Sequence, residues 1–97
     1  MLNMAVKILI RQKMPEKTDF QLNQLLDLMH KTASLQNGFF FNEYLTCSKN
    51  PGDRQVISTW QSMDHWRRWT QSREYKLIQN RIEDLTENKT EYTVYAH

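Results

Sequence analysis

The chain has 97 residues, of which 39% are hydrophobic and 25% are charged; these values predict one small globular domain spanning residues 1–97 and exclude a disordered chain. The formal net charge of +2 is too small to indicate nucleic acid or an anionic membrane as a partner. Cys47 is the only cysteine, so an internal disulfide and a cysteine-based zinc site are both excluded. With no segment typical of a signal peptide or a membrane span, we expect a cytoplasmic protein.

The first half of the chain predicts a strand, a helix and a second strand. Residues 4–12 alternate between apolar and polar side chains, which is the period of a strand. A capping-box pattern begins at Thr18, and leucines at helical spacing follow it. We expect this helix to end near Gln36, because Gly38 closely follows and glycine is a common helix stop. The aromatic-rich residues 39–47 predict the second strand.

The second half predicts a strand, two helices and a last strand. Residues 48–53 have the composition of a turn, so the third strand at residues 54–61 forms an antiparallel hairpin with the second. Ser62 and Ser72 each fit the N-cap of a helix. The first of these helices is short and carries two tryptophans, and the second is longer and amphipathic. Residues 91–97 predict the last strand.

This order of elements predicts an α+β fold, the ferredoxin-like βαββαβ arrangement. Its helices cover one face of a four-stranded antiparallel sheet. The three consecutive phenylalanines Phe39, Phe40 and Phe41 must point to both faces. An uncovered apolar face is rare in a monomer, so we expect a homodimer in which two sheets close a dimeric α+β barrel. In the alternative, one or two of these aromatic residues lie at a rim or under a loop.

Residues 56–72 carry a resemblance to a known family. Here a strand ends in Trp60, one residue and then Ser62 follow, and two tryptophans on a short helix precede Ser72. This pattern resembles the strand-to-helix signature of the antibiotic biosynthesis monooxygenase family, and the order of elements resembles that family over nearly the whole chain. The resemblance implies several activities: cofactor-independent oxidation of quinols and polyketide-like aromatics, haem degradation, isomerisation, or none. It therefore does not determine the reaction.

The residues that the cofactor-independent members use are only partly present. Their Trp at the end of the third strand matches Trp60. Their Asn four residues earlier falls at Val56, and their Tyr on the short helix falls at Trp66. Their Arg on the later helix falls at Asn80, next to Arg81. The resemblance thus implies a catalytic set that is incomplete in this chain.

The residues that the haem-degrading members use are less complete still. Those members use an Asn on the first strand, a Trp on the short helix and a His on the helix after it. The Trp matches Trp69, but the other two positions hold Lys7 and Gln79. Glutamine is not a usual ligand of haem iron, and lysine is normally protonated. We therefore expect no haem and no other cofactor.

We predict that O2 oxidises a small aromatic or quinol-type substrate in a pocket of the homodimer. Lys7 or Arg81 would supply the cation that stabilises a substrate anion. The catalytic candidates are Trp60, Trp69 and Arg81. The substrate-binding candidates are Lys7, Phe39, Phe41, Trp66 and Tyr75. In the alternatives that remain open, the tryptophans only pack the core and the protein is a non-catalytic module that binds a small molecule, or the protein binds haem.

The histidines and the cysteine give weaker signals. The three histidines lack the spacing of metal ligands, so we expect no metal site. His30 lies beside Lys31 on the first helix, and we expect it to face solvent. Cys47 lies on a predicted strand with no histidine near it in sequence, so we expect a small buried hydrophobic residue and not a nucleophile.

Overall fold

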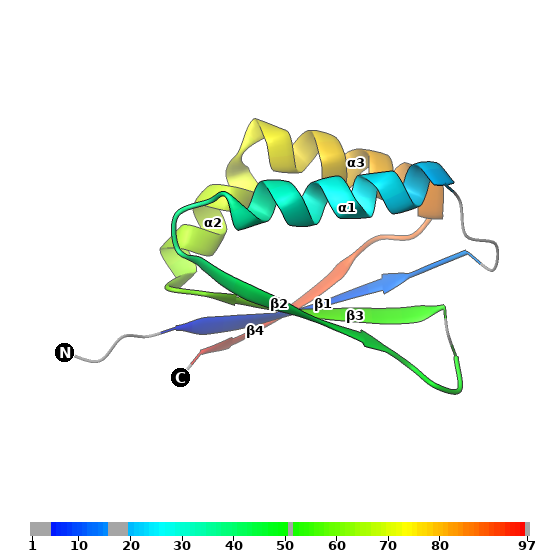
Figure 1. Ribbon diagram of the computed structural model, residues 1–97, viewed down its shortest axis with the longest axis horizontal. Helices are drawn as coiled ribbons and strands as arrows, with labels where there is room; N and C mark the ends of the chain where they lie inside the picture. The colour runs from blue at the N-terminus through cyan, green and yellow to red at the C-terminus, as the bar shows by residue number, and fades with distance from the viewer. Residues whose placement is uncertain (1–4, 16–19, 51, 97) are drawn as a thin grey trace.

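The computed structural model describes residues 5–15, 20–50 and 52–96. Within these residues the elements in chain order are β1 (Val6–Lys13), α1 (Phe20–Ser34), β2 (Phe39–Thr46), β3 (Asp53–Trp60), α2 (Met63–Gln71), α3 (Arg73–Thr86) and β4 (Glu91–Ala96). The strands form one antiparallel sheet in the order β2-β3-β1-β4. All three helices lie on one side of this sheet (Figure 1). The predicted ferredoxin-like α+β fold is confirmed.

The two serines predicted as helix caps have that role. The side-chain oxygen of Ser62 accepts a hydrogen bond from the backbone N–H of His65 at 3.3 Å. The side-chain oxygen of Ser72 does the same for Tyr75 at 3.2 Å. Each bond satisfies an amide that the helix itself leaves without a partner. Ser72 also lies at the end of α2, so the boundary between α2 and α3 is determined by contacts between neighbouring residues.

The connection from α1 to β2 contains a position that favours glycine. The helix ends at Ser34, two residues before the predicted end at Gln36. Gly38 has a φ angle of +86°, and a Cβ atom there would collide with the ring of His65, so a larger residue would be strained. The predicted cap of α1 at Thr18 lies outside the described residues.

The hydrophobic core lies between the sheet and the helices in two clusters. Trp60 is fully buried, and its ring makes edge contacts with Phe39 at 5.4 Å and with Trp66 at 5.8 Å between ring centroids, a favourable geometry for aromatic pairs. The buried residues of this cluster are Val6, Ile8, Ala33, Trp60, Trp66 and Trp69. The second cluster joins α1 to α3 through Leu22, Leu25, Ile78 and Ile82.

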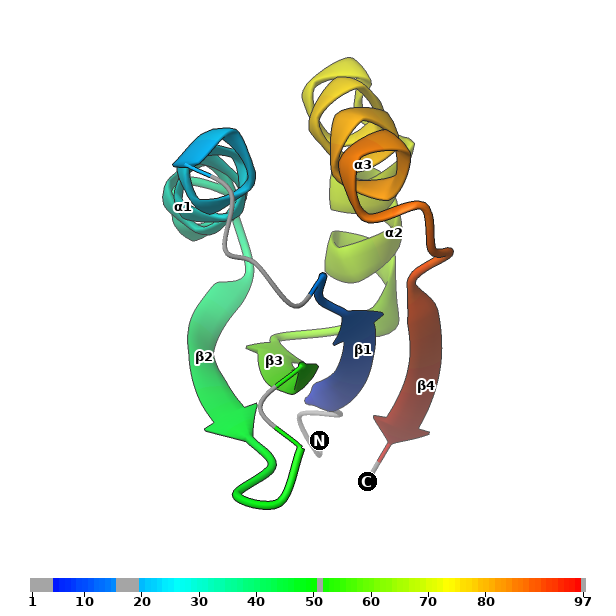
Figure 2. The same cartoon turned by 90° about the vertical axis from the view of Figure 1, so that its right-hand side faces the viewer.

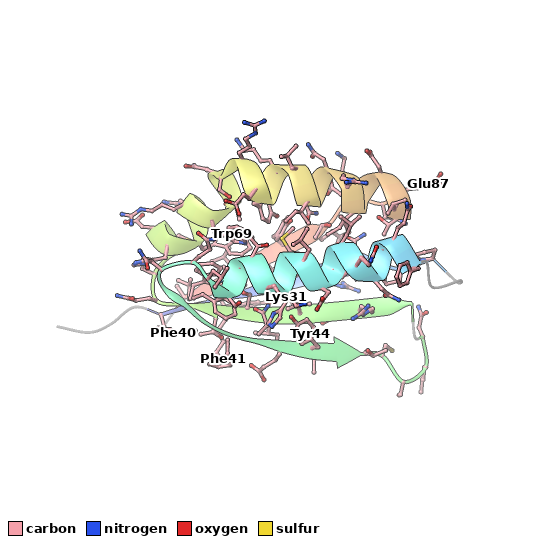
Figure 3. All side chains as sticks on the ribbon, turned by 45° about the horizontal axis from the view of Figure 1, so that its top comes forward. Lys31, Phe40, Phe41, Tyr44, Trp69 and Glu87 are labelled. Atoms are coloured by element: carbon pink, nitrogen blue, oxygen red, sulfur yellow. The ribbon has the colours of Figure 1, made fainter. Side chains whose placement is uncertain are left out.

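The opposite face of the sheet has no helix over it (Figure 2). We call it the outer face; the strand register places on it Lys7, Phe41, Leu45, Ile57 and Tyr95. Phe41 is 49% exposed, Leu45 is 48% exposed and Tyr95 is 57% exposed. Figure 3 shows Phe41 projecting from β2 away from the helices. Since Phe39 points to the helices, aromatic side chains reach both faces, as predicted.

A β-bulge in β2 decides which residues reach which face. Phe39 pairs with Trp60 and Phe41 pairs with Thr59, so the register shifts by one residue between them. Residues two apart on a regular strand share a face, and the extra residue breaks that rule here. Asn42 and Tyr44 therefore point to the helices, on the same side as Phe39.

Cys47 is exposed, so the prediction that it is buried is wrong. β2 ends at Thr46, and Cys47 belongs to the turn that follows, where its backbone N–H donates to the carbonyl of Asp53 at 3.3 Å. The turn lies past the last paired residue of β2, so Cys47 gains no cover from the helices. Among the described residues, no helix has both the length and the apolar character needed to cross a membrane.

Candidate active site

A cavity of about 110 Å³ lies between the inner face of the sheet and the three helices. Its aromatic lining residues are Tyr44, Trp66, Trp69, Tyr75 and Tyr92, and Ile10, Leu26, Met29, Val56 and Ile82 add aliphatic surface. Apolar protein cavities of about 150 Å³ bind benzene. The space is therefore of the size that suits a single small ring.

A polar cluster interrupts the apolar wall where α1 faces β2. Nδ1 of His30 lies 2.6 Å from the hydroxyl of Tyr44 and 3.2 Å from Nδ2 of Asn42. Nδ2 of Asn42 also donates to the Tyr44 hydroxyl at 3.2 Å. We call these three residues the His30 cluster. Figure 3 shows Tyr44 on the strand that runs beneath α1.

The His30 cluster leaves one buried polar atom without a partner. Oδ1 of Asn42 is buried and accepts no hydrogen bond from the described residues. Native structures rarely leave such atoms unpaired, and an exception calls for an explanation. Because Asn42 lines the cavity, a ligand hydroxyl inside the cavity can supply the missing hydrogen bond.

Two tyrosines form a second polar contact in the cavity wall. The hydroxyls of Tyr75 and Tyr92 are hydrogen-bonded to each other. The Tyr75 ring packs against Trp69 at 5.5 Å and the Tyr92 ring against Trp66 at 6.0 Å between centroids. Burial raises the pKa of both phenols, and the neighbouring Tyr92 raises that of Tyr75 further. Both tyrosines therefore stay protonated at neutral pH and serve as neutral wall residues.

A third polar group of the wall is fully occupied by internal contacts. Nε2 of Gln79 donates to the hydroxyl of Thr90 at 2.6 Å and to the carboxylate of Glu83 at 3.3 Å. The Thr90 hydroxyl in turn donates to Gln12. Burial of Glu83 opposes its ionisation, but the backbone N–H of Thr90 at 2.9 Å, Gln79 and Lys89 lower its pKa below the ordinary value. This network ties α3 to β1 and to Thr90, the residue before β4, and both amide protons of Gln79 are used.

Three of the predicted site residues line the cavity, namely Trp66, Trp69 and Tyr75. Trp60 and Phe39 lie behind it in the core. Trp60 is fully buried, and its Nε1–H donates to the hydroxyl of Ser58 at 2.8 Å. Trp60 therefore packs in the core, whereas Trp66 and Trp69 form part of the cavity surface.

The other three predicted site residues are not brought to the cavity. Lys7 and Phe41 lie on the outer face, since each pairs with Thr59. Arg81 is exposed on α3, one position before the buried Ile82. Neither cation that the sequence suggested therefore lines the cavity.

The structure adds residues that sequence reasoning missed. His30 is partly buried and lines the cavity, so the prediction that it faces solvent is wrong. A signal was available: His30 stands four residues after Leu26 and three before Ala33, which places all three on one helical face. Val56, where the resemblance led us to expect an Asn, lies directly across from Tyr44 in the register. The missed residues are His30, Asn42, Tyr44, Arg54 and Tyr92.

Clusters of possible metal ligands are absent from the described part of the chain, where no set of three or more His, Cys, Asp or Glu side chains lies close enough together to hold a metal ion. The polar groups that line the cavity include the His30 cluster and Arg54.

Comparison with known proteins gives a family match over most of the chain. The family model described as antibiotic biosynthesis monooxygenase matches residues 5–81. A comparison with curated proteins found no match.

Solved structures of low sequence identity share the fold. A conserved protein from Methanosarcina mazei Go1 matches with a TM-score of 0.85 at 13% identity, covering 96% of this chain and 92% of that one. A mutant of SnoaB, a cofactor-independent oxygenase from Streptomyces nogalater, gives 0.82 at 14% identity, with 94% and 90% coverage. Rv0793 from Mycobacterium tuberculosis gives 0.81 at 17% identity, with 96% and 94% coverage. At such identities these likenesses show the fold alone.

Proposed function

The chain belongs to the antibiotic biosynthesis monooxygenase family, and from this premise we propose that it oxidises a small aromatic or quinol-type substrate with O2 and no cofactor. One observation carries the proposal: the His30 cluster faces a small aromatic cavity and offers a buried acceptor without a partner. Aromatic walls suit a planar ring, and the cluster suits a hydroxyl group on that ring.

The first step of the proposed reaction is removal of a proton from the substrate. The substrate hydroxyl donates its proton to Tyr44, and the Tyr44 proton passes to Nδ1 of His30 across the 2.6 Å contact. Imidazole is the side chain best suited to take up a proton near neutral pH. Oδ1 of Asn42 accepts a hydrogen bond from a second hydroxyl on the ring. The resulting phenolate is electron-rich enough to react with O2.

The remaining steps balance without a cofactor. The phenolate passes one electron to O2, and the two radicals combine into a C–O bond at a ring carbon. His30 returns its proton to the peroxide so formed. The O–O bond then breaks as the same carbon loses its hydrogen, which leaves a carbonyl and releases water. A quinol and O2 thus give a hydroxyquinone and water, and the substrate supplies all four electrons that O2 takes up.

Oxygen uptake with simple quinols tests this proposal. We expect the purified protein to consume O2 with methylhydroquinone above the uncatalysed rate, and label from 18O2 to enter the product. His30→Gln should lower the rate about 100-fold or more, since general-base catalysis contributes that much. Lys31→Gln is the matched control, because Lys31 is the adjacent exposed residue and, among the described residues, its ion pair is with Asp27, at 2.9 Å.

Two results would count against an oxygenase. One is no uptake above the background rate, and the other is equal rates for the wild type and His30→Gln. If the quinol binds but no O2 is consumed, the non-catalytic module that binds a small molecule is the better description. A binding titration under nitrogen separates these outcomes, because it needs no turnover.

The residues present do not fit a haem. A macrocycle of four pyrrole rings needs far more room than a cavity of about 110 Å³. Gln79 stands at the position where haem degraders carry His, and its amide group donates hydrogen bonds to Thr90 and Glu83. A shifted Soret band after haem is added to the protein would contradict this assignment.

The proposal includes a homodimer formed through the outer face. Phe41, Leu45 and Tyr95 are each about half exposed there, and no helix covers them (Figure 2). A face that carries several half-exposed large apolar side chains and has no helix over it is a candidate association site. A second sheet packed on this face would close the expected barrel while leaving each cavity within its own subunit.

A further inference from the structure

Arg54 is a cation in the cavity wall without a protein partner. It is partly buried and lines the cavity, and it stands on β3 between Gln12 of β1 and Thr46 of β2. Among the described residues, its guanidinium makes no hydrogen bond and no ion pair. Asp53, the acid next to it in sequence, pairs with Arg11 at 3.6 Å, and strand alternation turns both to the outer face.

Nothing else in the cavity balances this charge. Within the described part of the chain, the lining contains no aspartate and no glutamate. The carboxylate of Glu83 is already held by the backbone of Thr90, by Gln79 and by Lys89 at 3.6 Å. A charge that loses part of its water without gaining a partner is unfavourable. The planar guanidinium presents two parallel N–H donors, which match the two oxygens of a carboxylate.

Arg54 lies one inward-facing position along the sheet from the His30 cluster. Val56 pairs with Tyr44, and Arg54 is the next residue of β3 on the same face. Two residues of a strand span about 7 Å, which is comparable to the distance between substituents on opposite sides of a benzene ring. One ring in the cavity can therefore contact both groups at once.

We propose that the cavity binds a single-ring phenolic acid, with Arg54 holding the carboxylate and the His30 cluster holding a ring hydroxyl. This inference rests on the proposed function and narrows its substrate class to quinols and phenols that carry a carboxylate. The small cavity excludes fused polycyclic rings. Arg54 favours single-ring phenols that carry a carboxylate over neutral phenols of similar size.

Binding of a matched pair of ligands tests the inference. The probes are 3,4-dihydroxybenzoate, which carries a hydroxyl opposite its carboxylate, and its methyl ester, titrated under nitrogen and followed by calorimetry. We expect the acid to bind about tenfold or more tightly than the ester. Arg54→Gln should weaken acid binding about 10- to 100-fold, the range expected for hydrogen bonds to a charged group, and leave ester binding within about twofold. Arg73→Gln, at an exposed arginine of α3, should change neither.

Equal affinities of the wild type for acid and ester would overturn the inference, and so would an equal loss of both in Arg54→Gln. If circular dichroism shows that Arg54→Gln does not fold, the affinities of acid and ester are compared in the wild type and in Arg54→Lys instead. The lysine keeps the charge but loses the paired donors, so Arg54→Lys should keep part of the preference for the acid over the ester. Since no O2 is present, a preference for the acid without later oxygen uptake would refute the proposed function alone. Uptake with neutral quinols and no preference would refute the phenolic acid alone.

Discussion

The two faces of the sheet use the same four strands for different purposes. The helix-covered face holds the fully buried Trp60, the His30 cluster and the cavity. The outer face is exposed and mixes apolar side chains such as Phe41 and Tyr95 with charged ones such as Lys7. Strand alternation sorts residues between the faces. One face therefore supplies the core and the candidate site, and the other is the face through which we propose that two copies associate.

The largest expected effect comes from the buried face. Trp60→Ala should lower the free energy of unfolding by about 3–5 kcal/mol, because it opens a large cavity in a packed core. Chemical denaturation measures this at several protein concentrations. Phe41→Ala is the contrasting change: its effect should shrink as the protein is diluted, since only the dimer buries that ring. If the two variants lose the same unfolding free energy at every protein concentration, the proposed assignment of the core to one face and of the dimer contact to the other is wrong.

The next effect separates chemistry from packing on the inner face. Tyr44→Phe keeps the ring but removes the hydroxyl that joins the substrate to His30, so the turnover rate with a quinol should fall about 100-fold. Affinity for the quinol should change only a few-fold. Tyr95→Phe makes the same change on the outer face and should leave turnover unaltered. Equal rates in both variants would remove Tyr44 from the reaction.

A smaller effect tests the outer face itself. Phe41→Glu should shift the sedimentation of the protein at micromolar concentration from a dimer toward the 11.8 kDa monomer, because an introduced charge opposes burial in an interface. Leu77→Glu is the control, since Leu77 is 55% exposed on α3, away from that face. A wild-type protein that already sediments as a folded monomer would contradict the shared barrel.

The smallest expected effect concerns the occupied polar network beside the cavity. The folded state lowers the pKa of Glu83, so its contribution to stability is present above the pKa of an unfolded-chain glutamate and is lost as pH falls through the lower folded value. Glu83→Gln should therefore reduce stability at pH 7 and flatten its decline in acid. Thermal melts between pH 7 and pH 3 measure this. A decline that is unchanged in the variant would show that other groups control it.

Local patterns were enough to predict the elements and their order. Ser62 and Ser72 mark helix starts through chemistry that involves only neighbouring residues. The strand patterns, the glycine at position 38 and the reach of the phenylalanines to both faces also depend on short stretches of chain. The matching family model supports the same fold. These features need no knowledge of how distant segments pair.

The candidate site could not be predicted in the same way, because it depends on register. His30, Tyr44 and Arg54 come from three elements, and they meet only after the sheet has formed. Simple alternation from Phe39 places Phe41 in the pocket and Asn42 outside. The bulge between Phe39 and Phe41 reverses these two placements, and no motif in the sequence predicts the bulge. Lys7 became a candidate because the resemblance aligns it with a site residue of the family, although strand alternation places it on the face opposite Val6 and Ile8.

The bulge in β2 takes up one residue without changing which later side chains reach α1. Phe39 pairs with Trp60 and Phe41 pairs with the adjacent Thr59, so Phe40 is the residue that the pairing skips. Replacing Phe40, or deleting it, would therefore leave Asn42 opposite Ser58 and Tyr44 opposite Val56, because the shortened strand would alternate regularly. The strand can thus lose one residue at this position and keep its polar wall, whereas in a regular strand a slip of one residue exchanges the two faces.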